Sequence, residues 1–172
     1  MIARRSLAAL LFALPGVVAG CGWEPLYADR ETGPADDALR AIKVNPIAER
    51  IGQRLAMGLR KSFNPTGIPT PQRYTLTVSL ATSLVSLGVQ SQGLGTRGSV
   101  HVTGSYNLQD IKGGSPLATG SVHAVESFDI QANGYSTVVA QDDAYTRCAE
   151  EIRREVVARM TLFMQRKAMA KS

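Results

Sequence analysis

Stretches in which apolar and polar residues alternate constrain the middle of this chain more than any other feature. Between Tyr74 and Leu84 the apolar side chains occupy even positions, and Thr or Ser fills most of the odd ones. The same period of two returns over 100–108 and 122–130. Successive side chains of a strand point to opposite faces, so each stretch predicts a strand with one buried and one solvated face.

The junctions between these stretches predict how the strands connect. Lys112-Gly113-Gly114 is typical of a tight turn, and short turns between alternating segments indicate an antiparallel meander. A longer segment rich in Gly, Ser and Gln separates the first two stretches and runs through Gly98. The alternation changes phase at Leu84-Val85, which predicts a bulge or the end of a strand there.

Helical spacing precedes and follows the meander. Asn45 is the expected N-cap of the first helix, with Pro46 in its first turn and its end before Asn64-Pro65. The second helix is expected from about Val138 to about Lys167. The apolar stripe of the first comprises Ile47, Ile51, Leu55, Leu59 and Phe63, and that of the second comprises Tyr145, Cys148, Ile152, Val156, Met160 and Phe163.

The order of these elements defines the expected fold. Ile42 and Val44 flank Lys43 as a short strand before the first helix, so the order is β-α-β-β-β-α. The simplest way to bury both helical stripes is against one sheet. We therefore expect an α+β fold in which two helices pack on one face of a four-stranded, mostly antiparallel sheet.

The first residues have the pattern of an export signal. Arg4 and Arg5 precede a short apolar core, which is shorter than the roughly 20 residues that span a bilayer. The segment ends in Val18-Ala19-Gly20-Cys21, which resembles a bacterial lipobox. Cleavage between Gly20 and Cys21 would leave the Cys21 thiol to carry diacylglycerol. The alternative is an ordinary signal peptide in which Cys21 is incidental.

This interpretation divides the chain into three parts. Residues 1–20 form the lipoprotein signal peptide, 21–38 the lipidated N-terminus and a polar tether, and 39–172 a single domain. Similar lipoproteins often keep an aspartate after the cysteine when they stay in the inner membrane. Gly22 stands here instead, so we expect an outer-membrane, periplasm-facing protein anchored by its acyl chains.

Composition argues against several kinds of chemistry. Two histidines and two cysteines are too few for a multi-histidine metal centre, a four-thiolate zinc site or a disulfide-dense scaffold. A formal charge of +5 is too small for a dedicated nucleic-acid binder. We therefore expect no metal and no nucleic-acid partner. The sequence also contains no Gly-x-Ser-x-Gly or His-Glu-x-x-His motif, so we expect no enzymatic activity and no cofactor.

The motifs that suggest chemistry have simpler explanations. Residues 93–98 match G-x-G-x-x-G but open a strand, whereas a dinucleotide site needs them to open a helix. Adjacent acids at 142–143 and 150–151 point about 100° apart on a helix, which suits a solvated face. His101 and His123 fall on the polar face of neighbouring strands and lack further ligands. Cys148 on the apolar stripe indicates a buried structural thiol.

Two basic residues carry a binding hypothesis. Arg97 stands at a strand start beside glycines, and Lys112 lies in a hairpin turn. If both turns reach an anionic glycolipid, their cations can pair with its phosphates. The alternative for each is a solvated surface cation.

Three segments together carry a family resemblance. They are residues 21–27 (CGWEPLY), residues 42–47 with 50–55 (IKVNPI and RIGQRL), and Tyr135 followed by Ala140, Asp142, Ala144 and Arg147. In this order they resemble the lipobox start, the first strand and helix, and the closing helix of the lipopolysaccharide-assembly lipoprotein LptE family, in its alphaproteobacterial form. The middle strands match only in pattern.

The resemblance implies a non-catalytic role. LptE-like proteins plug the lumen of the β-barrel LptD, help that barrel to assemble, and take part in delivering lipopolysaccharide to the outer leaflet. An LptD-like barrel and lipopolysaccharide are the partners this implies. The resemblance does not place the family's lipopolysaccharide contacts in this sequence, so binding of lipopolysaccharide by Arg97 and Lys112 is a hypothesis from their positions alone. The alternative is an auxiliary lipoprotein of another envelope lipid-trafficking system of the ABC type.

Overall fold

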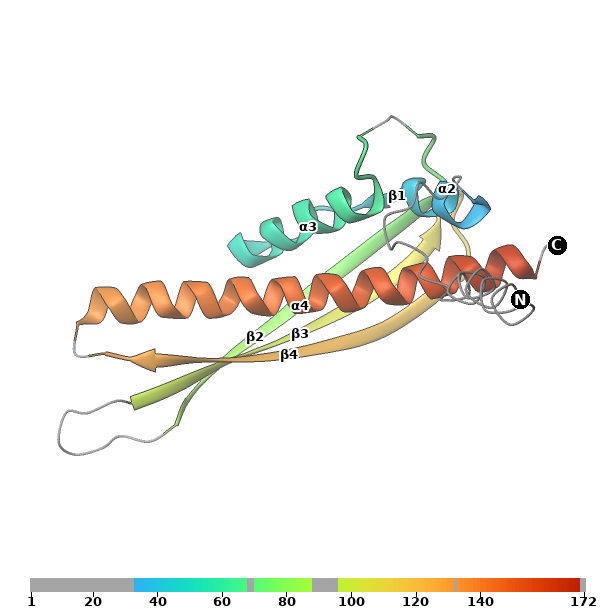
Figure 1. Cartoon of the computed structure of the whole chain (residues 1–172). Coiled ribbons are helices and arrows are strands. Elements are labelled where there is room, and N and C mark those ends of the chain that lie inside the picture. Colours follow the sequence, from blue (N-terminus) through green and yellow to red (C-terminus); the bar gives the residue numbers. More distant parts are fainter. Residues whose placement is uncertain (1–32, 68–69, 88–95, 132, 171–172) are drawn as a thin grey trace, which may run out of the picture. The chain divides into compact units, whose positions relative to one another are not determined.

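A computed structural model describes residues 33–67, 70–87, 96–131 and 133–170 of the chain. Four strands form one sheet in the order β1-β2-β3-β4, with β1 parallel to β2 and the other pairs antiparallel. Helices α3 and α4 lie on the same side of this sheet (Figure 1). The predicted α+β class is confirmed. The elements are α2 (Pro34–Arg40), β1 (Ile42–Val44), α3 (Glu49–Phe63), β2 (Tyr74–Leu87), β3 (Thr96–Asp110), β4 (Ala118–Ile130) and α4 (Gly134–Met169).

The core lies between the sheet and the two long helices. Alternate residues of the central strand β3 are fully covered, because α4 packs over one face of that strand. On α3, Leu55 and Leu59 fill the space beside α4. Each buried aliphatic side chain of this size contributes about 2 kcal/mol through the hydrophobic effect. The fully buried large side chains are Leu55, Leu59, Leu76, Val100, Val102, Leu108, Cys148, Ile152, Val156, Met160 and Met164.

Strand β2 corrects one sequence expectation. The pairing of β2 with β3 continues without interruption to Leu87↔Arg97, so Leu84-Val85 is neither a bulge nor a strand end. Leu84 and Val85 are 49% and 40% exposed, respectively. The phase change arises because residues 81–85 are exposed on both faces of the sheet. Without a buried face, the strand no longer requires alternation.

The start of α3 corrects a second expectation. Asn45 does not cap the helix, because its Nδ2 donates to Thr77 Oγ1 at 2.9 Å and α3 begins only at Glu49. The intervening segment leads Ile47 into the core, where its Cγ2 would lie 2.6 Å from a Cβ added to Gly52. Glu49 has a φ of 65°, a left-handed conformation that favours glycine. The predicted end of the helix before Asn64 is confirmed.

Helix α2 lies partly in the segment that was interpreted as tether. Residues 34–38 are helical, and Ala35, Ala38 and Leu39 pack against the core. The local signals are Pro34 in the first turn with Asp36 and Asp37 beside it, a composition that suits a helix N-terminus. The sequence did not predict this helix, because seven residues make only about two helical turns and show too little periodicity.

Helix α4 was predicted with nearly its observed bounds. It begins four residues earlier than expected, because the Asn133 side chain caps it by accepting from Tyr135 N at 3.0 Å. The turn at Gly113 and Gly114 also follows the prediction, with φ of 87° and 116°. No helix within the described ranges combines the length and the hydropathy required to cross a membrane.

The core makes a direct prediction for stability. Leu59→Ala removes a fully buried side chain between α3 and the rest of the core, and should lower the free energy of unfolding by about 2–5 kcal/mol. Met57 is 60% exposed on the same helix, so Met57→Ala should change it by less than about 0.5 kcal/mol. Urea denaturation followed by circular dichroism measures both. Equal losses from the two variants would contradict the assignment of the core.

Candidate functional site

The sheet has one face that no helix covers within the described structure (Figure 1). The register places the odd-numbered residues of β2, β3 and β4 together on this face. We call it the open face. Ten of its side chains carry a hydroxyl: Thr75, Thr77, Ser79, Ser83, Ser99, Thr103, Ser105, Thr119, Ser121 and Ser127.

Small uncharged groups dominate the centre of the open face. Ser79, Ser105 and Ser121 are cross-strand partners and form a row of serines across three strands. All three are exposed. Arg97 on β3 and Asp129 on β4 carry opposite charges on the open face. They form an ion pair at the end of the face where β3 begins, with 3.6 Å between Nε and Oδ1. The open face therefore offers hydrogen-bonding groups with little net charge.

The two histidines meet on the open face. Their ring centroids lie 5.8 Å apart, and they are diagonal neighbours, since His123 pairs with Thr103 and His101 with Val125. Each ring contacts a hydroxyl at 3.1 Å, His101 that of Ser99 and His123 that of Thr103. A search of the described residues finds no group of three or more metal-binding side chains. These rings are surface groups held by hydrogen bonds.

Asn107 carries a buried acceptor among the residues of the open face. It lies in β3, between Thr77 of β2 and Thr119 of β4. Its Oδ1 is buried and has no hydrogen-bond partner in the described part of the chain. A buried amide oxygen without a partner costs about 1–3 kcal/mol, and because it is buried the open face does not present it to a partner.

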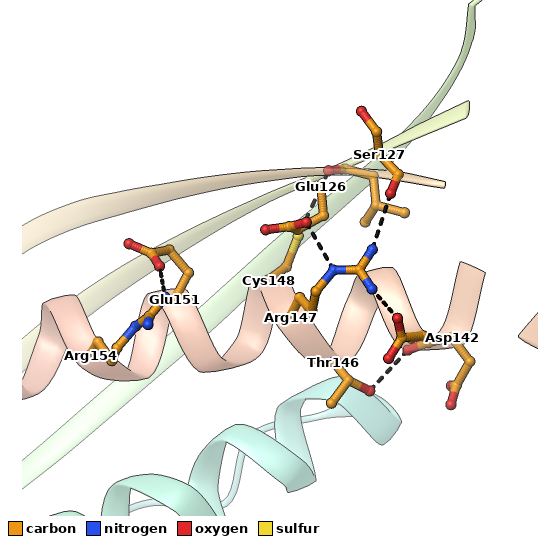
Figure 2. Close-up of polar contacts among 10 residues, drawn as sticks. Glu126, Ser127, Asp142, Thr146, Arg147, Cys148, Glu151 and Arg154 are labelled. Atoms are coloured by element: carbon orange, nitrogen blue, oxygen red, sulfur yellow. Dashed lines mark hydrogen bonds and ion pairs between the residues drawn. The ribbon is translucent and has the colours of Figure 1, made fainter. Parts of the chain in front are cut away.

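Arg147 joins the start of α4 to the edge strand β4. Figure 2 shows its guanidinium between the helix and the strand. Nε donates to Glu126 at 2.9 Å, Nη2 donates to Ser127 O at 3.1 Å, and Nη1 pairs with Asp143. The hydrogen bond with Glu126 raises the pKa of Arg147. This cluster holds α4 over the covered face, on the side of the sheet opposite to the open face.

Cys148 lies next to this cluster but is inert. It is fully buried, and its thiol points to Val100 O at 3.8 Å. Burial raises the pKa of the thiol to about 11. Because the thiolate is the nucleophile, a thiol with this pKa is poorly reactive at neutral pH. The sequence-based interpretation of a buried, structural thiol agrees with this geometry.

The two basic residues of the binding hypothesis lie far apart. Arg97 is at the start of β3, and Lys112 follows the other end of that strand, where its backbone N–H donates to Asp110 Oδ1 at 3.0 Å. Asp110 lies thirteen positions after Arg97, which corresponds to about 40 Å of strand. One glycolipid headgroup cannot contact both, so each must be considered as a separate contact.

Several predicted positions lie outside the described residues. These include the cleavage site at Gly20 and Cys21, the tether up to residue 32, and Gly93 and Gly95 of the glycine motif. The described end of that motif, from Thr96 to Gly98, is part of β3 and opens no helix. At Gly98 an added Cβ would lie 2.5 Å from the Phe128 ring, so this glycine accommodates packing of the aromatic ring.

Sequence reasoning missed a basic cleft of about 610 Å³ beside β1. Arg40, Lys43, Arg60 and Lys61 line it, together with apolar residues of β1 and α3. Arg60 Nη2 donates to Val44 O at 3.1 Å across the cleft. The sequence signal that could have indicated this cleft is the basic last turn of α2 and of α3, because cations favour helix C-termini.

Comparison with solved structures shows a shared fold. A candidate lipoprotein from Caulobacter crescentus CB15 superposes with a TM-score of 0.62 at 20% identity, covering 76% of this chain and 96% of that one. A minor lipoprotein from Acinetobacter baumannii gives a TM-score of 0.47 at 14% identity, covering 69% of this chain and 92% of that one. Rare lipoprotein B from Shewanella oneidensis gives 0.41 at 9% identity, covering 75% and 96%, respectively.

The sequence comparisons add no family. A scan against protein-family models matched none of them, and a search of curated proteins found no significant similarity. The resemblance in fold to the Caulobacter protein therefore supports the architecture alone.

The buried thiol makes a testable prediction. In the folded chain with Cys21→Ser, Cys148 should react with iodoacetamide at least about 100-fold more slowly at neutral pH than in urea, because burial limits access and raises its pKa. The buried, protonated Cys148 thiol stabilises the folded chain below pH 9.0, the ordinary pKa of cysteine. This stabilisation is lost as the pH rises through about 11, the raised pKa of the folded state. Alkylation rates measured by mass spectrometry test the first statement. Rapid labelling of a chain with native circular dichroism would contradict it.

Proposed function

We propose that the chain is a lipid-anchored outer-membrane protein that faces the periplasm, plugs a β-barrel of the LptD type and helps that barrel to assemble. It takes part in this way in delivering lipopolysaccharide to the outer leaflet. It works as a binding module without catalysis. The single observation that carries this proposal is the open face, a sheet surface of hydroxyl groups with little charge that no described helix covers.

The chemistry of the open face suits the inside of a barrel. The lumen of an outer-membrane barrel is polar, and its strands present alternate side chains inward. Serine and threonine hydroxyls both donate and accept hydrogen bonds, so they can pair with many polar partners at low desolvation cost. The row of Ser79, Ser105 and Ser121 is the set of side chains that we assign to this contact.

Other observations support the same class of protein. The lipobox-like residues end at Cys21, and the segments that resemble the LptE family include β1 and parts of α3 and α4. The fold is shared with a candidate lipoprotein. We assign contact with lipopolysaccharide phosphates to Arg97 and to Lys112 as two separate sites, because one headgroup cannot contact both.

The partnership makes the next prediction. Affinity purification of the tagged chain from detergent-solubilised outer membrane should recover a large β-barrel protein. Ser79→Glu with Ser121→Glu places two carboxylates on the open face and should lower the recovered barrel at least about tenfold, because a buried unpaired charge is strongly disfavoured. Quantitative mass spectrometry of the eluate measures this.

Arg154→Glu provides the matched control. It changes the formal charge by the same amount on an exposed part of α4, and its ion pair with Glu151 is a surface pair of small energy. If the wild-type chain, the Ser79→Glu and Ser121→Glu chain and the Arg154→Glu chain all recover the barrel equally, the open face is not part of the interface. Recovery of an inner-membrane ATPase complex in place of a barrel would favour an auxiliary role in an ABC-type system.

The anchor makes a separate prediction. Mass spectrometry of the native protein should show Cys21 as the first residue, carrying diacylglycerol on its sulfur. Cys21→Ser should move the chain from the membrane fraction to the soluble fraction, because two or more acyl chains are what make membrane residence stable. An unmodified thiol on a chain found free of the envelope would refute the anchoring.

A further inference from the structure

Charge is unevenly divided along the domain. Eight basic residues gather where β1 begins, β3 ends and α4 ends: Arg40, Lys43, Arg60, Lys61, Arg73, Lys112, Arg166 and Lys167. We call this group the cationic end. Only three acids, Asp36, Asp37 and Asp110, lie in the same region, which leaves a formal excess of five positive charges.

Contacts of the structure bring these residues together. Arg40, Lys43, Arg60 and Lys61 line one cleft. Arg73 N donates to Ala41 O at 2.9 Å, and Ile111 N donates to Arg73 O at 2.8 Å, so Arg73 links the cleft to the hairpin turn that carries Lys112. The Nζ of Lys167 lies 4.6 Å from the centre of the Tyr74 ring at the start of β2. Figure 1 shows α2, β1 and the last turns of α4 at this end of the sheet.

Ion pairing divides the domain at the same boundary. The other seven basic residues between positions 33 and 170 are all arginines, and every one of them forms an ion pair. Within the described residues, no member of the cationic end forms one. The eight acids outside this region balance the seven arginines almost completely. The net positive charge of the described domain therefore resides at one end.

Helix geometry explains some of these positions but leaves their charge available. Arg40, Arg60, Lys61, Arg166 and Lys167 lie in the last turns of α2, α3 and α4, where they favourably oppose the helix dipoles. A helix end carries only about half an elementary charge. Lys43, Arg73 and Lys112 lie outside helices. The surface keeps a strong positive potential that an anionic partner can neutralise.

The chain enters the domain at this same end. Helix α2 leads from Pro34 to Ala41, the residue that accepts from Arg73, and its seven residues span about 10 Å. Twelve positions separate Cys21 from Gly33, so a fully extended chain between them reaches at most about 40 Å. An anchor at Cys21 therefore keeps its leaflet within that distance of the point where the chain enters the cationic end.

We propose that the cationic end docks on the headgroups of anionic phospholipids in the leaflet that holds the Cys21 anchor. This inference relies on the anchoring part of the proposed function. Acyl chains fix the chain to the leaflet, and a cationic surface adds an electrostatic attraction that orients the domain. The open face and the far end with Arg97 then point away from the headgroups and remain accessible to a protein partner.

Vesicle binding tests this docking without the anchor or a barrel. The mature chain with Cys21→Ser should bind vesicles of phosphatidylcholine and phosphatidylglycerol much more strongly than vesicles of phosphatidylcholine alone, and high salt should weaken the binding. Lys43 and Lys61 are exposed, so Lys43→Glu with Lys61→Glu should keep the fold. Affinity should fall about thirtyfold or more, since each lost cation weakens binding about fivefold.

Arg50→Glu with Arg154→Glu is the matched control, because it makes the same change of charge at exposed arginines outside the cationic end. The control should keep at least half of the wild-type affinity. Equal losses from both variants, or no preference for anionic vesicles, would overturn the proposal. If the Glu variant loses its circular dichroism spectrum, Lys43→Gln with Lys61→Gln replaces it, with an expected loss of about thirtyfold.

Neither result depends on the barrel partnership, because the vesicles contain no protein. A chain that binds anionic vesicles but recovers no barrel would disprove the plug function alone. A different result would assign the cationic end to an acidic protein surface. In that case vesicle binding shows no lipid preference, and the wild-type chain recovers a barrel whereas the Lys43→Glu and Lys61→Glu chain does not.

Discussion

Burial of one face of β3 beneath α4 is the contact on which the rest of the structure depends. Val100, Val102 and Leu108 are inaccessible on that face, and the stripe of α4 from Cys148 to Met164 covers them. Without α4 this apolar face of the meander would be exposed to water, so the helix is required to complete the core. Covering one face only is also what leaves the hydroxyl groups of the other face free for a partner.

The sequence predicted the long elements that have one buried side, whereas α2 also packs against the core but was too short to be found. Residues 74–80 and 100–108 alternate because a strand against α4 must separate apolar from polar side chains. The exposed end of β2 does not alternate, and this produced the false bulge at Leu84-Val85. Asn45 was misassigned as a cap because its partner, Thr77, is distant in sequence and becomes a neighbour only through the parallel pairing of β1 and β2.

The candidate site was less accessible to sequence reasoning than the fold. The hydroxyl residues of the open face were visible as the polar half of the alternation, and the apolar position of Cys148 was predicted correctly. The wide separation of Arg97 and Lys112 required the register of β3, because both looked alike as cations near turns. The cationic end joins residues from six separate elements and connections, and no local pattern links Lys43 to Lys167.

The order of the elements along the chain has a consequence for folding. Helix α4 follows β4, so its residues are synthesised after the three strands that it helps to cover. Until α4 has emerged, strands β2 to β4 lack the surface that buries their apolar side. The core of the described domain therefore forms only once its last helix is available.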